Sequence, residues 1–335
     1  MAAEDAGPPA PLCRVEYRRR QSAQNNERAR TTRGNPRTRA KPTPSHLGPP
    51  STIPAVLGCE MARRATVDLP GVRLAYLEIG SPGRPPVLLL HGGAAHAHWF
   101  DAILEPLAAR FHVVALDQRG HGESRWTVPP AYATEDFSGD LVTVLDRLGW
   151  PRASLVGHSM GGHNALAFAA WHPERTRSLV VVDTRPAIPP ERLTRMRERG
   201  QRPRRVYPTL EVAVASFHLL PPDTVADPAL LAHLARSAFV GRDGGFALRF
   251  DPACYTERRP VDLWPLVPGV EAPALVIRGE RSPVLPRDVA ERLGQALPAG
   301  RLVEIAGAHH HVPLDRPVEM AAALLEFLAE VPSSR

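Results

Sequence analysis

Short apolar runs alternate with longer amphipathic stretches along most of the chain after about residue 62. The runs are continuously apolar and rich in β-branched residues, which is typical of strands buried on both faces of a sheet. They lie at 86–90, 111–116, 153–157, 178–183, 273–279 and 301–307. Apolar residues recur at helical spacing between most of them, at 99–111, 137–150, 161–174, 286–297 and 317–331. This order predicts an α/β fold whose mostly parallel sheet is covered by helices on both faces.

Two segments depart from this alternation. Residues 66–80 hold a Pro-Gly pair between two alternating runs, which predicts an antiparallel hairpin at the edge of the sheet. Between Val182 and Pro273 no central strand is evident, and the sequence reads as helical pieces separated by Pro and Gly. We therefore expect residues 185–268 to form a helical cap over the strand ends, where insertions line the ligand crevice of open α/β sheets.

The first 62 residues differ from the rest of the chain in composition and in hydrophobic pattern. Residues 18–54 are rich in Arg, Pro, Thr and Ser and lack periodic apolar positions, so they cannot bury enough surface to offset their ordering entropy. We predict a disordered tail over residues 1–62, followed by a core in two parts, 63–184 and 269–335, on either side of the cap. A natural start near Met61 is a hypothesis that N-terminal sequencing would test.

The charge of the chain is concentrated in this tail. The 335 residues carry a net charge of +6, yet residues 1–60 hold ten Lys and Arg against five Asp and Glu, and the rest hold 31 against 30. The predicted folded part is therefore nearly neutral, and no nucleic-acid-reading module accompanies the basic tail. No apolar run is long enough to cross a bilayer, and the N-terminus lacks a secretion signal. We expect a cytoplasmic protein that binds neither nucleic acid nor membrane; its three cysteines form no disulfide framework.

One serine is surrounded by glycines. In Gly157-His158-Ser159-Met160-Gly161 the serine follows a predicted strand and precedes a predicted helix. Such a strand-to-helix turn exposes a serine hydroxyl, and small residues at plus and minus two allow the close backbone approach that the turn needs. A simple helix N-cap is the alternative explanation for Ser159.

A second glycine-bearing loop follows the run at 86–90, in the sequence His91-Gly92-Gly93. Its position is the one that supplies the second N–H group of an oxyanion hole. We therefore assign the hole to the backbone N–H groups of Gly93 and Met160.

These motifs resemble those of the α/β-hydrolase superfamily. HGG, DQRGHGES at 117–124, GHSMGG and GAHHHVPLDRP at 307–317 stand in the family's order and spacing. The resemblance covers residues 64–331 and implies an eight-stranded sheet with a helical cap. It also implies that the catalytic base lies in the loop after the last strand. Laying the family's Gly-Ala-Gly-His-x-Val-Pro over Gly307–Pro313 places the base on His310, with His309 where the family has glycine.

The family's usual acid position departs from the pattern. The stretch Gly279-Glu280-Arg281-Ser282 is followed by Pro283, whose side chain cannot stabilise an imidazolium. Two residues can replace the acid, Asp183 at the end of the preceding strand and Glu280 beside the usual position. We favour Asp183, because a strand terminus holds a carboxylate rigidly.

Together the motifs predict a serine hydrolase that cleaves an ester or related acyl bond of a small molecule through an acyl-enzyme. Three alternatives stay open, namely a C–C bond hydrolase, a cofactor-free haloperoxidase and a weakly catalytic or non-catalytic ligand-binding homologue. The strand-to-helix turn that carries Ser159 is called the nucleophile elbow. A serine at this position argues against haloalkane dehalogenases and epoxide hydrolases, which resemble the family but carry aspartate there.

We predict no cofactor and no metal, since three consecutive histidines at 309–311 rarely reach one ion. Phe217 and Trp264 are the expected apolar walls of the substrate pocket.

Overall fold

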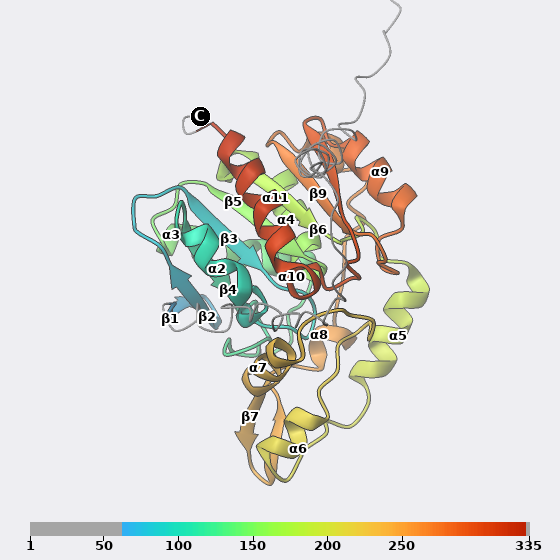
Figure 1. The fold of residues 1–335 in the computed structure, drawn as a ribbon. Helices are drawn as coiled ribbons and strands as arrows, with labels where there is room; N and C mark the ends of the chain where they lie inside the picture. The colour runs from blue at the N-terminus through green and yellow to red at the C-terminus, as the bar shows by residue number, and fades with distance from the viewer. Residues whose placement is uncertain (1–61, 333–335) are drawn as a thin grey trace, which may run out of the picture. The chain divides into compact units, whose positions relative to one another are not determined.

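An eight-stranded sheet runs through the part of the chain that the computed structural model describes, residues 62–332 (Figure 1). The spatial order is β1-β2-β4-β3-β5-β6-β9-β10, in which β2 is antiparallel to both of its neighbours and all other pairs are parallel. The strands are β1 (Arg63–Leu69), β2 (Val72–Ile79), β3 (Pro86–Leu90), β4 (His112–Leu116), β5 (Ala153–His158), β6 (Thr176–Val182), β9 (Ala274–Gly279) and β10 (Gly300–Ile305). The predicted fold class is confirmed.

Helices cover both faces of the sheet because the central strands bury apolar side chains on both faces. In β3, Leu88 and Leu90 face one apolar cluster, whereas Val87 and Leu89 face the other. The first cluster includes residues of α3 (Thr134–Arg147), α4 (Met160–Trp171) and α9 (Arg287–Ala296). The second includes residues of α2 (Asp101–Ala108) and α11 (Pro317–Glu330). Within residues 62–332, no helix combines the length and the apolar character that a bilayer crossing requires.

The predicted N-terminal hairpin is also confirmed. Leu69 of β1 pairs with Val72 of β2, so only Pro70 and Gly71 lie between the paired residues. Gly71 has φ of 78°, a backbone conformation that glycine adopts without the steric cost of a side chain. The predicted tail over residues 1–62 falls outside the described residues except for Ala62.

The insertion between β6 and β9 is not purely helical as predicted. Figure 1 shows its elements gathered beside one end of the sheet. They are α5 (Pro190–Gly200), α6 (Leu210–Ala215), α7 (Pro228–Ala238), α8 (Ala253–Thr256), the 3₁₀ turn η5 (Val267–Gly269) and a hairpin of β7 (Phe239–Arg242) and β8 (Gly245–Leu248). The hairpin turns at Asp243-Gly244, where Gly244 has φ of 85°. Asp-Gly is a strong hairpin signal. The domain limits at 184 and 268 stay a prediction.

The parallel strands end at one edge of the sheet, and the loops that follow them carry the predicted site. His91-Gly92-Gly93 follow β3, Ser159 follows β5 and Asp183 follows β6. His310 lies after β10, before the short helix α10 (Val312–Asp315). The topology therefore gathers residues that are far apart in sequence. The remaining short 3₁₀ segments are η3 (Ala97–Phe100) and η4 (Pro173–Arg175).

A hydrogen bond between α7 and the start of α2 predicts a pH-dependent contribution to stability. His233 Nε2 lies 2.7 Å from Asp101 Oδ2, and this bond raises the pKa of His233 above its usual value. The bond therefore stabilises the fold fully below the unfolded pKa of about 6.5, and its contribution is lost as the pH rises through the folded value. The difference in Tm between the wild type and His233→Gln should be larger at acidic than at alkaline pH. A difference that does not change with pH would contradict this.

Candidate active site

Ser159 sits on a strained turn between β5 and α4. Its φ of 52° and ψ of −115° are conformations that residues with side chains rarely adopt, and they point to a functional constraint. The flanking glycines are needed for space. A Cβ on Gly157 would lie 2.2 Å from the carbonyl oxygen of Gly161, and one on Gly161 would lie 2.1 Å from that of Leu90. Any side chain at either position would therefore displace the backbone that holds the serine.

The structure brings Ser159 and His310 together. Ser159 Oγ lies 3.0 Å from His310 Nε2, although 151 residues separate the two in sequence. On the other side of the ring, His310 Nδ1 lies 2.7 Å from Asp183 Oδ2. A carboxylate can only accept, so Nδ1 carries the proton and the Nε2 lone pair faces the serine hydroxyl. This is the geometry of a nucleophile, a base and an orienting acid.

The two candidate acids have different surroundings. Asp183 is fully buried, and it accepts hydrogen bonds from the Gly279 N–H and the Ser282 hydroxyl as well as from His310. Glu280 instead accepts the Gly307 N–H at 2.7 Å and is exposed, so it braces the loop after β10. The geometry favours Asp183.

Burial disfavours the charged forms of both His310 and Asp183. It lowers the pKa of His310 well below its usual value, an effect to which neighbouring His311 and Arg192 add. It raises the pKa of Asp183 to about 7, and the hydrogen bonds from Ser282 and Gly279 oppose this rise because they stabilise the carboxylate. The imidazole is consequently unprotonated at neutral pH and free to accept the serine proton.

Ser159 opens onto a cavity of about 480 Å³. Gly93 and Met160 line it beside the serine, and Met160 is the first residue of α4, where a backbone N–H has no acceptor within the helix. Phe217 also lines the cavity, as expected. Trp264 does not, and this part of the prediction is corrected. Its ring packs beside the core and lies 4.0 Å from the guanidinium carbon of Arg292 on α9.

Comparisons with known proteins agree with this fold. A family model described as "alpha/beta hydrolase fold" matches residues 85–207. A protein of Danio rerio named serine hydrolase-like protein is 30% identical over 276 residues, which are 74% of this chain and 82% of that protein. The chain belongs to the α/β-hydrolase family.

Two further similarities cover most of this α/β-hydrolase. The 2-(acetamidomethylene)succinate hydrolase of Mesorhizobium japonicum is 29% identical over 265 residues, which are 78% of this chain and 94% of that protein. A crystal structure of E-2-(acetamidomethylene)succinate hydrolase matches with a TM-score of 0.72 and 27% identity, over 80% of this chain and 99% of that one. These similarities identify the protein as a hydrolase, and they do not specify which bond it cleaves.

Two other histidines support the site of this α/β-hydrolase in ways that the sequence did not reveal. His158 Nε2 donates to the carbonyl of His310 at 2.9 Å, and its ring stacks on Trp99. His311 Nε2 donates to the carbonyl of Pro221 at 2.8 Å, which ties the loop after β10 to the insertion. Burial lowers the pKa of both rings, so both are neutral donors. The sequence gives no sign of this role, because His158 occupies the variable position between Gly157 and Ser159.

The same histidines belong to one of two groups of described residues that could hold a metal ion. Nitrogen atoms of His158, His310 and His311 lie within 4.8 Å of one another, and His98, Asp101 and His233 form a second such group. In the first group, both nitrogens of His310 already bond Ser159 and Asp183. Binding an ion through His310 would break one of these bonds, so the arrangement favours proton transfer over metal ligation.

Proposed function

We propose that this hydrolase cleaves a carboxylic ester or a related acyl bond of a small molecule through an acyl-enzyme on Ser159. The observation that carries the proposal is the pair of short contacts around His310, 3.0 Å to Ser159 Oγ and 2.7 Å to Asp183 Oδ2, at the wall of a cavity. A hydroxyl is a poor nucleophile without a base in reach, and here the base is both present and oriented.

In the proposed reaction His310 Nε2 takes the Ser159 proton while Oγ attacks the carbonyl carbon. The N–H groups of Gly93 and Met160 stabilise the resulting oxyanion. His310 then returns the proton to the leaving alcohol, and the carbon–oxygen bond of the ester breaks to leave an acyl-serine. A water molecule, deprotonated by His310, attacks this acyl group and releases the acid and the free serine. Asp183 holds the imidazole in the required tautomer throughout and stabilises its charged form.

The insertion between β6 and β9 is proposed to act as the cap that selects the substrate. Phe217, Met196 and Leu219 from this segment line the cavity, together with residues of the loops that follow β3, β5 and β10. Apolar walls of this kind recognise the hydrocarbon portion of a ligand, while a few polar groups orient it.

A fluorophosphonate probe tests the proposal directly. We expect rapid labelling of one site, found by peptide mass spectrometry at Ser159, because only an activated serine attacks phosphorus quickly. Ser159→Ala protein, checked for an unchanged Tm, is the control and should take up no label. A series of p-nitrophenyl esters of increasing acyl length would then measure the pocket.

Each outcome points to one of the possible activities. Labelling together with ester turnover supports the proposal. Labelling of Ser159 without cleavage of any ester would replace it with a C–C bond hydrolase or a haloperoxidase, which use the same serine. A protein that takes up no label would be a ligand-binding homologue without catalysis.

A further inference from the structure

Arg258 lies buried in the wall of the cavity that contains Ser159. Only 2% of its surface is exposed, and it is among the largest fully buried side chains of the described residues. Its Nη2 donates to Asn164 Oδ1 at 3.0 Å, and its guanidinium carbon lies 4.8 Å from the centre of the Phe137 ring. Within residues 62–332, Nε and Nη1 of Arg258 have no hydrogen-bond partner. Two buried donor nitrogens are therefore left unused.

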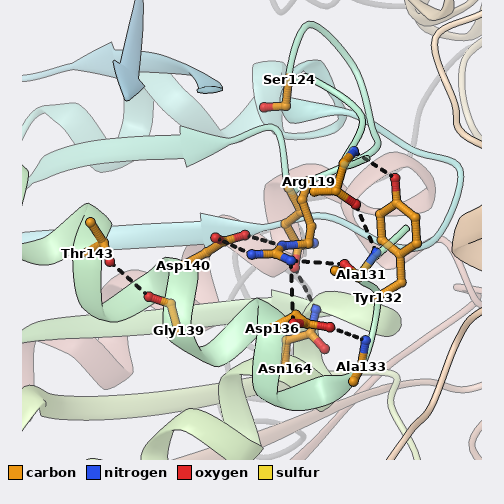
Figure 2. A network of polar contacts seen from close by, with 12 residues as sticks. Arg119, Ser124, Ala131, Tyr132, Ala133, Asp136, Gly139, Asp140, Thr143 and Asn164 are labelled. Carbon is orange, nitrogen blue, oxygen red and sulfur yellow. Dashed lines mark hydrogen bonds and ion pairs between the residues drawn. The ribbon is translucent and has the colours of Figure 1, made fainter. Parts of the chain in front are cut away.

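A second buried arginine, Arg119, differs from Arg258 because carboxylates of the protein neutralise its charge. The guanidinium carbon of Arg119 lies 6.0 Å from the centre of the same Phe137 ring. Arg119 donates to both oxygens of Asp140, each at 2.6 Å (Figure 2). Asp136 is 3.7 Å away, and the carbonyl of Ala131 accepts a further hydrogen bond. Arg258 forms no ion pair with any carboxylate of residues 62–332. Its charge lacks the compensation that Arg119 receives.

The cavity as a whole is positively charged. Its only acidic lining residue is Asp183, whose carboxylate already accepts hydrogen bonds from His310, Ser282 and Gly279. The lining includes five arginines, which are Arg185, Arg192, Arg195, Arg199 and Arg258. All five belong to the β6–β9 insertion, and the other four are more exposed than Arg258. The deepest positive charge therefore has no ion-pair partner among the described residues, although Glu135 acts on it through space.

The Arg258 side chain remains charged despite its burial. Burial lowers its pKa to about 10, which still leaves the guanidinium protonated at neutral pH. An unpaired buried charge costs stability, and proteins retain such features mainly where a ligand uses them. Neutral His163 and the thiol of Cys254, whose pKa is raised by burial, offer it no negative charge.

We propose that Arg258 binds a carboxylate group of the substrate, so that this hydrolase acts on small acyl compounds that carry a free carboxylate. This inference rests on the proposed function, since it names the substrate class of the same site. Guanidinium groups recognise carboxylate and phosphate alike. A singly charged carboxylate matches the single buried charge and its two free nitrogens better than a dianion does.

A binding experiment on the catalytically silent protein tests the proposal without relying on turnover. Ser159→Ala protein would be titrated calorimetrically with monomethyl glutarate, which has one ester and one carboxylate, and with dimethyl glutarate, its neutral counterpart. We expect the monoester to bind at least about tenfold more tightly, as for a buried charge-assisted hydrogen bond. Adding Arg258→Gln should remove this preference.

Matched variants separate a specific contact from a general effect of charge. Arg197→Gln removes an exposed arginine of α5 that is not among the cavity-lining residues, and it should leave the preference within about twofold, because an exposed charge is screened by water. Arg258→Met, whose straight apolar chain suits the buried site, is a second variant, and circular dichroism and Tm verify folding. The proposal is overturned if Ser159→Ala protein shows no preference or binds neither ester, or if the preference survives in folded Arg258 variants. Failure of fluorophosphonate labelling would instead overturn the catalytic proposal and leave this binding result standing.

Discussion

Replacing Ser159 by alanine should lower kcat for a p-nitrophenyl ester by about 10⁶-fold, to the level left by binding and oxyanion stabilisation alone. The alcohol oxygen that forms the acyl-enzyme is lost, and His310, 3.0 Å away, has no group to deprotonate. Pre-steady-state release of p-nitrophenol measures the effect, because the acylation burst of the wild type should disappear.

The substitution is expected to leave the fold intact. The Ser159 hydroxyl accepts no helix-capping hydrogen bond, and alanine adds no atoms to the turn. A purified Ser159→Ala protein that keeps more than about 1% of wild-type turnover would show that another residue is the nucleophile, since removal of a true nucleophile costs far more.

Asp183→Asn should lower kcat by about 10⁴-fold while KM changes little. Asparagine has the same shape and tolerates the φ of 49° found at this position. Its amide would, however, present an N–H donor to His310 Nδ1 and turn the Nε2 proton toward Ser159, which is the wrong tautomer. The measurement is kcat and KM with the best ester of the acyl-length series.

Glu280→Gln is the matched control for this substitution. It makes the same chemical change in the other candidate acid, whose carboxylate braces the Gly307 N–H and is not bonded to His310. Turnover should stay within about twofold of the wild type, because an exposed hydrogen bond of this kind contributes little. A large loss in Glu280→Gln with none in Asp183→Asn would reverse the assignment of the acid.

Most of the fold could be predicted because its determinants are local. The central strands consist mainly of consecutive apolar residues, and such a run has few alternatives to a sheet buried on both faces. The hairpin at Phe239–Leu248 was missed although Asp243-Gly244 marks its turn, since helical patterns on its N-terminal side dominated the interpretation. Short strands outside the main sheet carry too little periodicity to stand out.

The site could be predicted only as far as motifs reach. Ser159 and His310 stand in recognisable sequences, whereas the choice between Asp183 and Glu280 depends on which carboxylate faces the imidazole in space. Arg258 gave no signal, because an arginine in an irregular segment is normally solvated. Only the packing of α3, α4 and the segment after α8 around it makes this one buried and unpaired. Trp264 was misplaced for the same reason, since a bulky ring in an insertion can face either the cavity or the core.

The distance in sequence between Ser159 and His310 has a consequence for biosynthesis. The residues of the turn that carries Ser159 have been translated by the end of α4, whereas His310, the proposed base, follows only after β10. A polypeptide growing on the ribosome therefore contains Ser159 for another 151 residues before His310 is added. In the proposed mechanism Ser159 becomes reactive only after β10 has paired with β9 and His310 has reached the serine. A chain that ends before β10 lacks this base, so its Ser159 should be chemically inert.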